Sequence, residues 1–117
     1  MEQLMENIVK ILDDKKGIDI KVLDIRELTT MADYFVICTG TSSPHIKALS
    51  DELDEKLSEK GISFLSKEGF QTANWILMDY DNVIVHIFSE ETREFYSIEN
   101  LWSDAKDVDI SDLIKEN

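Results

Sequence analysis

Basic residues, histidine, cysteine and proline are all scarce in this chain of 117 residues. The single cysteine, Cys38, has no partner for an internal disulfide, which is typical of a protein in a reducing compartment. No apolar run approaches the ~18 residues of a membrane-spanning helix. The opening segment, MEQLMENIVK, carries acidic residues where a signal peptide has an apolar run. These absences predict a cytoplasmic protein of one domain that makes no contact with a membrane.

Acidic residues dominate the charge. The chain has 25 Asp and Glu against 12 Lys and Arg, which gives a net charge of −13. Such a surface repels phosphate backbones, and no block of Lys or Arg offsets it, so we expect no direct DNA binding and little direct RNA contact. A basic protein partner fits the charge, because complementary fields steer encounter. Solubility alone explains the same charge, and composition leaves both interpretations open.

Apolar periodicity predicts three helices and about five strands in the order α-β-β-α-β-β-β-α. We place the helices at residues 4–16, 44–60 and 90–102, and the strands at 18–25, 34–40, 62–69, 74–80 and 83–88. Ser43 caps the second helix and Ser89 the third. The inner face of the third helix is expected to consist of Phe95, Ile98, Leu101 and Trp102.

These elements predict an α/β fold built on a single layer of mixed sheet. The strand–helix–strand unit at residues 34–67 is expected to be a right-handed parallel crossover. Residues 74–88 form an antiparallel hairpin. The domain covers residues 1–105, and residues 106–117 are expected to be a short, weakly held acidic tail.

The hairpin reads NWILMDYDNVIVHIF and has two different sides. If Asp81 and Asn82 form its turn, one side is apolar and suits the core; it consists of Ile76, Met78, Tyr80, Val83, Val85 and Ile87. The other side also carries an Asp and a His; it consists of Trp75, Leu77, Asp79, Ile84, His86 and Phe88. If all three helices share one face of the sheet, this second side is partly open and marks a binding surface. If the first helix crosses over, the second side is buried, and a slipped register exchanges the two sides.

Asp79 and Asp81 also allow a catalytic interpretation. Together with TGTSS at residues 39–43 they resemble nucleotidyltransferases, which hold divalent metal between two carboxylates. The long gap from Gly40 to Asp79, and the place of Asp81 in the turn, argue against it. We therefore expect no metal and no cofactor.

The chain's other reactive residues support no catalytic centre either. Cys38 lies within an apolar strand, which predicts a buried, inert thiol. His86 lacks a Gly-x-Ser-x-Gly elbow, so a strand histidine is the better interpretation. His45 is expected to be solvated or to hold a local contact.

Three blocks of residues resemble the ribosomal silencing factor family, also called Iojap-like, over roughly residues 5–105. The first block consists of Asp24, Leu28, Thr29, ADYFVICTG at 32–40 and Ser42. The second consists of Glu68, Gly69, Trp75, Asp79, Tyr80, Val85, His86 and Phe88. The third is REFYSIENLWSDA at 93–105. Family members often have Gly at position 81, Gln at 45 and Leu at 98, and the Asp at 81 leaves the type of the hairpin turn open.

The resemblance implies a translational repressor with no enzymatic activity and a nucleotidyltransferase-like topology without the active site. Such factors bind the large ribosomal subunit through its protein L-fourteen, sterically block joining of the small subunit, and lower translation when nutrients are short. Some members form homodimers when free. The alternative is a metal-dependent nucleotidyltransferase-like enzyme or a nucleotide-binding protein.

The hairpin residues are our candidates for partner binding. Trp75, Leu77 and Phe88 are the expected apolar anchors, and Asp79 accepts a hydrogen bond from a partner Arg or Lys. His86 orients Asp79 or touches the partner, and Tyr80 is a further candidate, although the register turns it inward. On the last helix we expect internal packing for Tyr96 and Trp102, and an ion pair with a nearby carboxylate for Arg93.

Overall fold

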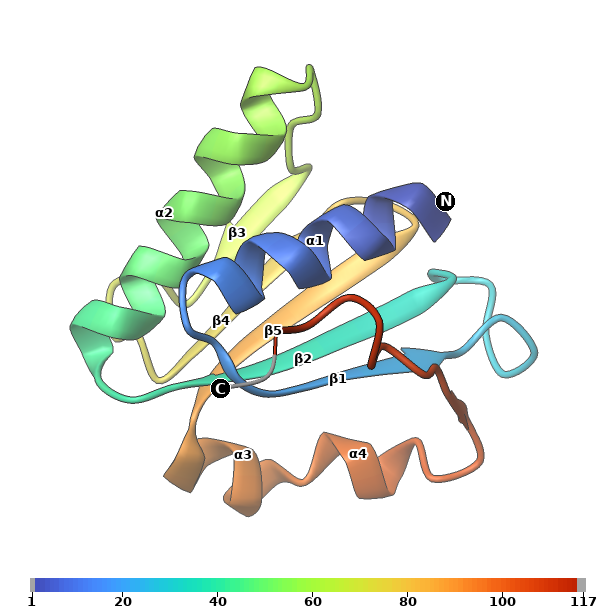
Figure 1. The fold of residues 1–117 in the computed structure, drawn as a ribbon. Coiled ribbons are helices and arrows are strands. Elements are labelled where there is room, and N and C mark those ends of the chain that lie inside the picture. Colours follow the sequence, from blue (N-terminus) through green and yellow to red (C-terminus); the bar gives the residue numbers. More distant parts are fainter. Residues whose placement is uncertain (1, 116–117) are drawn as a thin grey trace.

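The computed structural model describes residues 2–115 and shows a mixed sheet with helices on both faces (Figure 1). The helices are α1 (Glu2–Asp14), α2 (Ser43–Glu59), α3 (Glu90–Tyr96) and α4 (Ile98–Leu101). The strands are β1 (Ile18–Asp24), β2 (Tyr34–Gly40), β3 (Ser66–Glu68), β4 (Trp75–Asp79), β5 (Val83–Ser89) and β6 (Lys106–Asp107). No helix within the described residues is long and apolar enough to cross a bilayer.

The sheet has the strand order β3-β4-β5-β2-β1-β6, one strand more than predicted. Strands β2 and β5 are parallel, and all other neighbours are antiparallel. The predicted α/β fold with a single mixed sheet is confirmed. The unit at residues 34–67 differs in detail, because β2 and β3 run in the same direction but β5 and β4 lie between them.

Helices α1 and α2 cover one face of the sheet (Figure 1). Their apolar stripes, which include Ile8, Leu12, Leu49 and Leu53, are fully buried against side chains from β2, β4 and β5. The cap of α2 lies one residue earlier than predicted, since the hydroxyl of Ser42 accepts the hydrogen bond of the His45 amide.

The hairpin of β4 and β5 has the predicted register. Trp75 pairs with Phe88, Leu77 with His86 and Asp79 with Ile84, while Ile76, Met78 and Tyr80 point into the α1/α2 core. The amide of Tyr80 donates to the carbonyl of Val83 over 2.9 Å, which closes the turn. Asp81 has a φ of 75°, a conformation in which glycine is the least strained residue.

Helices α3 and α4 cover the other face, so the three helices do not share one face as one alternative required (Figure 1). The predicted third helix is split at Ser97, whose φ of 46° is left-handed. The break changes the helical phase. Ile98 is buried as predicted, whereas the inward placement of Phe95 and Leu101 was wrong, because both side chains are largely exposed.

The segment after residue 105 is held more firmly than expected. Strand β6 pairs with β1, and the chain then passes over the α1 face, where Ile110 is buried. Lys115 donates its amide to Asp13 over 2.8 Å. Residues 106–115 are thus packed on the domain, and the last two residues of the expected tail lie outside the described part of the chain.

Candidate partner-binding surface

An aromatic layer fills the space between the hairpin and α3. The Trp75 ring stacks on Phe88 with their centroids 4.9 Å apart, and Tyr96 of α3 lies against Trp75 at the same distance. Phe88 is fully buried beneath the tryptophan, while Trp75 and Leu77 are partly exposed. Of the three predicted anchors, Trp75 and Leu77 can meet a partner directly, and Phe88 supports them from below.

His86 lies within this layer and is 5 % exposed. The indole N–H of Trp75 donates to His86 Nδ1 over 3.1 Å, which assigns the ring proton to Nε2. Burial lowers the pKa of His86 to about 4, so the ring is neutral near pH 7. Of the two roles predicted for His86, orienting Asp79 or touching the partner, the first is not what the structure shows. His86 orients Trp75 instead.

Asp79 faces the same side as Trp75 and Leu77 but is engaged in the turn. Its Oδ1 accepts the hydrogen bond of the Asp81 amide over 2.7 Å. The carboxylate therefore fixes the hairpin end, and Asp79 lies at the end of the Trp75/Leu77 side of β4 rather than at its centre.

Tyr80 lies on the opposite side of the sheet. It is buried, and its ring meets Phe64 edge-on with their centroids 6.4 Å apart. Burial raises the pKa of its phenol. Tyr80 and Trp75 therefore lie on opposite faces of the sheet. This agrees with the register, which was expected to turn Tyr80 inward.

Residues of α3 and α4 complete the aromatic layer, and some of them are more exposed than the sequence predicted. Tyr96, expected inside, is half exposed while packing on Trp75. Phe95 meets Tyr96 edge-on with their centroids 5.0 Å apart and is exposed on its outer side. Trp102 packs edge-on against Phe35, in agreement with the expected internal role. The one sequence signal for this arrangement is Ser97, a residue type that favours helix ends over helix interiors.

Arg93 fixes α3 and α4 to the sheet, and the predicted pairing with a carboxylate is confirmed. Its guanidinium donates to both carboxylate oxygens of Glu99, over 2.9 and 3.1 Å. It also donates to the Asp19 carbonyl over 2.9 Å and to the Thr39 hydroxyl over 2.7 Å. The ion pair holds the pKa of Glu99 below its usual value. Asp19 reaches this position because β1 bulges between Ile18 and Lys21.

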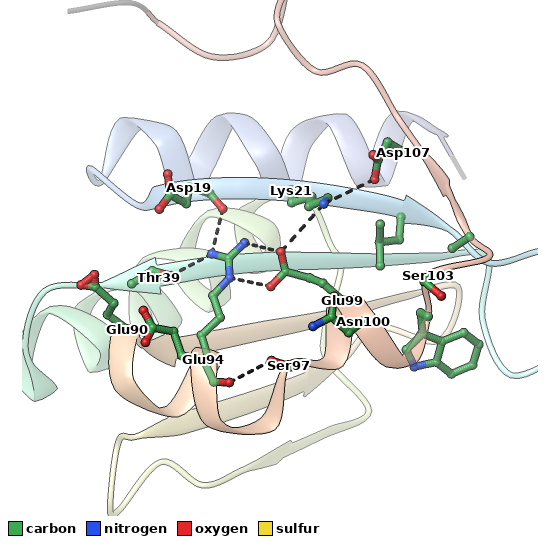
Figure 2. Close-up of a pocket in the computed structure, with 14 residues that line it drawn as sticks. Asp19, Lys21, Thr39, Glu90, Glu94, Ser97, Glu99, Asn100, Ser103 and Asp107 are labelled. Atoms are coloured by element: carbon green, nitrogen blue, oxygen red, sulfur yellow. Dashed lines mark hydrogen bonds and ion pairs between the residues drawn. The ribbon is translucent and has the colours of Figure 1, made fainter.

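The hydrogen bonds that Arg93 makes to Glu99, Asp19 and Thr39 form a clamp between α3, α4 and the sheet. An open groove of about 630 Å³ surrounds this Arg93 clamp (Figure 2). Figure 2 shows that most of its labelled charged side chains are acidic: Asp19, Glu90, Glu94, Glu99 and Asp107, against Lys21. Because four of the five N–H groups of the Arg93 guanidinium donate to groups of the protein itself, the centre of the groove has a structural role.

The residues of the catalytic alternative do not converge on one site. Residues 2–115 contain no group of three or more His, Cys, Asp and Glu side chains placed to hold a metal. Cys38 is buried, which raises the pKa of its thiol to about 12. Beside the TGTSS segment, His45 accepts the Thr41 amide at Nδ1 over 2.9 Å and lies 3.0 Å from the Lys15 carbonyl through Nε2. His45 thus connects the first turn of α2 to the turn that follows α1.

Known proteins are similar to this chain in sequence and in fold. The family model described as "Ribosomal silencing factor during starvation" matches residues 1–117. "Ribosomal silencing factor RsfS" of Halalkalibacterium halodurans is 34% identical over 97% of each chain. The mouse protein "Mitochondrial assembly of ribosomal large subunit protein 1" is 28% identical over 85% of this chain and 45% of its own length.

A crystal structure of a protein from Chromobacterium violaceum superposes with a TM-score of 0.86. It is 33% identical and covers 88% of this chain and 86% of its own. The match of the family model is full length, and the bacterial relative is similar from end to end. The chain therefore belongs to the ribosomal silencing factor family.

Proposed function

We propose that this protein represses translation by binding the large ribosomal subunit through ribosomal protein L-fourteen, where it blocks joining of the small subunit. The observation that carries the proposal is the partly exposed pair Trp75 and Leu77, presented by an acidic member of the silencing-factor family. The mouse relative is named for the ribosomal large subunit, which supports that subunit as the target. No chemical reaction is needed, since occupation of the surface is sufficient.

The tryptophan suits this role because it is held rigidly before binding. Its ring is fixed by Phe88, Tyr96 and the hydrogen bond to His86. A fixed aromatic side chain loses little conformational entropy when it enters a partner's pocket, and tryptophan is among the residues that most often dominate binding energy. The direct contacts we propose are Trp75 and Leu77 at the centre and Asp79 at the rim, with His86 and Phe88 as supports.

Charge supports a protein target over bare RNA. A net charge of −13 repels ribosomal RNA and favours a basic protein that lies within it. Binding should therefore weaken as salt concentration rises. The Cα atoms extend over 34 × 34 × 32 Å. Two docked surfaces lie in contact with little more than bridging waters between them, so a body of this size cannot fit between the two subunits. A factor of this size on the joining surface acts by simple occlusion.

Co-sedimentation with purified large and small subunits, followed by a subunit-joining assay, tests this proposal. We expect the wild-type protein to sediment with the large subunit alone and to inhibit joining. Trp75→Ala should lose both properties while remaining folded by circular dichroism. Phe70→Ala is the matched control, because Phe70 is a partly buried aromatic packed on the opposite, α1/α2 face.

Three results would contradict the proposal: no sedimentation of the wild-type protein with large subunits, normal binding by folded Trp75→Ala, or an equal loss in Phe70→Ala. Self-association is the competing use of this surface in the free protein. Light scattering with and without L-fourteen measures it, and we expect any dimer to dissociate as L-fourteen is added.

A further inference from the structure

Exposed apolar side chains continue from the hairpin onto the α3–α4 segment. Phe95 is 79% exposed, Tyr96 49% and Leu101 77%. The rings of Phe95, Tyr96 and Trp75 form an unbroken series, with centroid distances of 5.0 and 4.9 Å. Leu101 is exposed on α4, the helix that follows directly, and several large apolar side chains exposed on two consecutive short helices are typical of a protein-contact surface.

Tertiary contacts of α3 and α4 hold these apolar side chains on the outside of the protein. Arg93 ties its own helix to β1, β2 and α4 through four hydrogen bonds, so α3 cannot roll to bury Phe95. The left-handed Ser97 then sets the phase of α4, which buries Ile98 and exposes Leu101. The hydrogen bonds of Arg93 and the conformation of Ser97 therefore hold Phe95 and Leu101 on the outer side of their helices.

Acidic side chains surround these exposed apolar residues and indicate which kind of partner can bind there. Glu91 lies one helical turn before Phe95 on the outer side of α3, and Glu90 and Glu94 lie on the same short helix. A second copy of this chain would bring a second net charge of −13 against these carboxylates, and nucleic acid would bring phosphates. A basic protein surface meets the same carboxylates favourably.

We propose that Phe95, Tyr96 and Leu101 extend the Trp75/Leu77 surface into one docking site for a basic protein, with Glu91 receiving a Lys or Arg of that partner. This inference rests on the proposed function, since it assigns α3 and α4 to the same ribosomal contact. The occupant has an apolar centre for the aromatic rings and a cationic border for the acidic side of α3. Aromatic residues at the core of an interface and charges at its border are the usual division of roles.

Binding of wild-type and variant proteins to purified large ribosomal subunits tests the assignment. Phe95→Ala removes a mostly exposed ring, so the thermal midpoint should stay near that of the wild type. Its affinity for the large subunit should fall about fivefold or more, which corresponds to about 1 kcal/mol and marks a side chain that contributes to the interface. Glu91→Lys should also weaken binding. Glu55→Lys is its matched control, because Glu55 is an exposed glutamate on α2, across the sheet, and the change in net charge is the same.

Each outcome separates the two proposals. Failure of the wild-type protein to bind large subunits overturns the proposed function together with this inference. Wild-type binding with unchanged affinity of Phe95→Ala overturns this inference alone. Equal weakening by Glu91→Lys and Glu55→Lys would show that net charge acts rather than the α3 surface, which also overturns it. A parallel measurement with isolated ribosomal RNA should show no binding, and tight RNA binding would exclude a protein occupant.

Discussion

Protonation of His86 should destabilise the folded protein in mildly acidic solution. The ring is buried in the aromatic layer, and its Nδ1 already accepts the indole N–H of Trp75. A proton on Nδ1 would remove this acceptor and place a charge among Phe35, Trp75 and Phe88. Folding therefore favours the neutral ring, which is why the pKa lies near 4 rather than at the ordinary value of 6.5.

The size and the pH window follow from these two pKa values. Above pH 6.5 the ring is neutral in both states and the stabilisation is complete. Below pH 6.5 the unfolded chain binds a proton that the folded chain refuses until the pH reaches about 4, so stability falls over this interval. The values differ by about 2.5, at about 1.4 kcal/mol per unit, which gives about 3 kcal/mol in total and about 2 kcal/mol between pH 7 and pH 5.

Urea unfolding at pH 7, 6 and 5 measures this loss, with His86→Gln as the comparison. The Gln side-chain oxygen can still accept from Trp75, but the side chain does not titrate. We expect the wild type to lose about 2 kcal/mol more than His86→Gln between pH 7 and pH 5. Carboxylate effects are common to both proteins. Equal losses in the two proteins, or an NMR titration of His86 centred near 6.5, would refute the reasoning.

Three further predictions concern the backbone and the polar clamp. Gly69→Ala should cost about 2 kcal/mol or more of unfolding free energy, because φ is 82° and the new Cβ would clash with the Trp75 carbonyl oxygen. Arg93→Lys should cost about 2–3 kcal/mol, since an ammonium cannot reproduce the paired bonds to Glu99. Asp81→Gly should add roughly 0.5–1 kcal/mol by relieving the positive φ of the hairpin turn. Chemical denaturation at pH 7 measures all three, and a change of opposite sign would contradict the corresponding argument.

The hairpin was predictable from the sequence because its two sides differ so clearly. A strand has a period of two, so the placement of the Asp81–Asn82 turn fixes every cross-strand pair at once. The structure has the expected pairs from Trp75–Phe88 to Asp79–Ile84. What the sequence left open was the cover of the second side, since this depends on how the helices are distributed between the faces of the sheet.

The last helix was not predictable in the same way. Phe95, Ile98, Leu101 and Trp102 fit one helical stripe, and hydrophobic period alone places all of them inside. The observed phase depends on Ser97, and on Arg93 reaching a carbonyl that a bulge in β1 makes available. Both are tertiary interactions. A helix of seven residues is too short for its intrinsic helix propensity to determine which side faces the sheet, so these interactions decide its orientation.

The same tertiary causes determine which apolar side chains are exposed beside Trp75. Had the helix continued unbroken, Phe95 and Leu101 would lie against the sheet, and Trp75 would be the border of a largely polar surface. The break at Ser97 and the Arg93 clamp place apolar side chains beside the tryptophan, on a protein whose charge repels phosphate. Changes at Ser97 or Arg93 should therefore weaken ribosome binding although neither residue is proposed to touch the partner. The loss should follow displacement of α3, which carries Phe95 and also Tyr96, one of the side chains that fix the Trp75 ring.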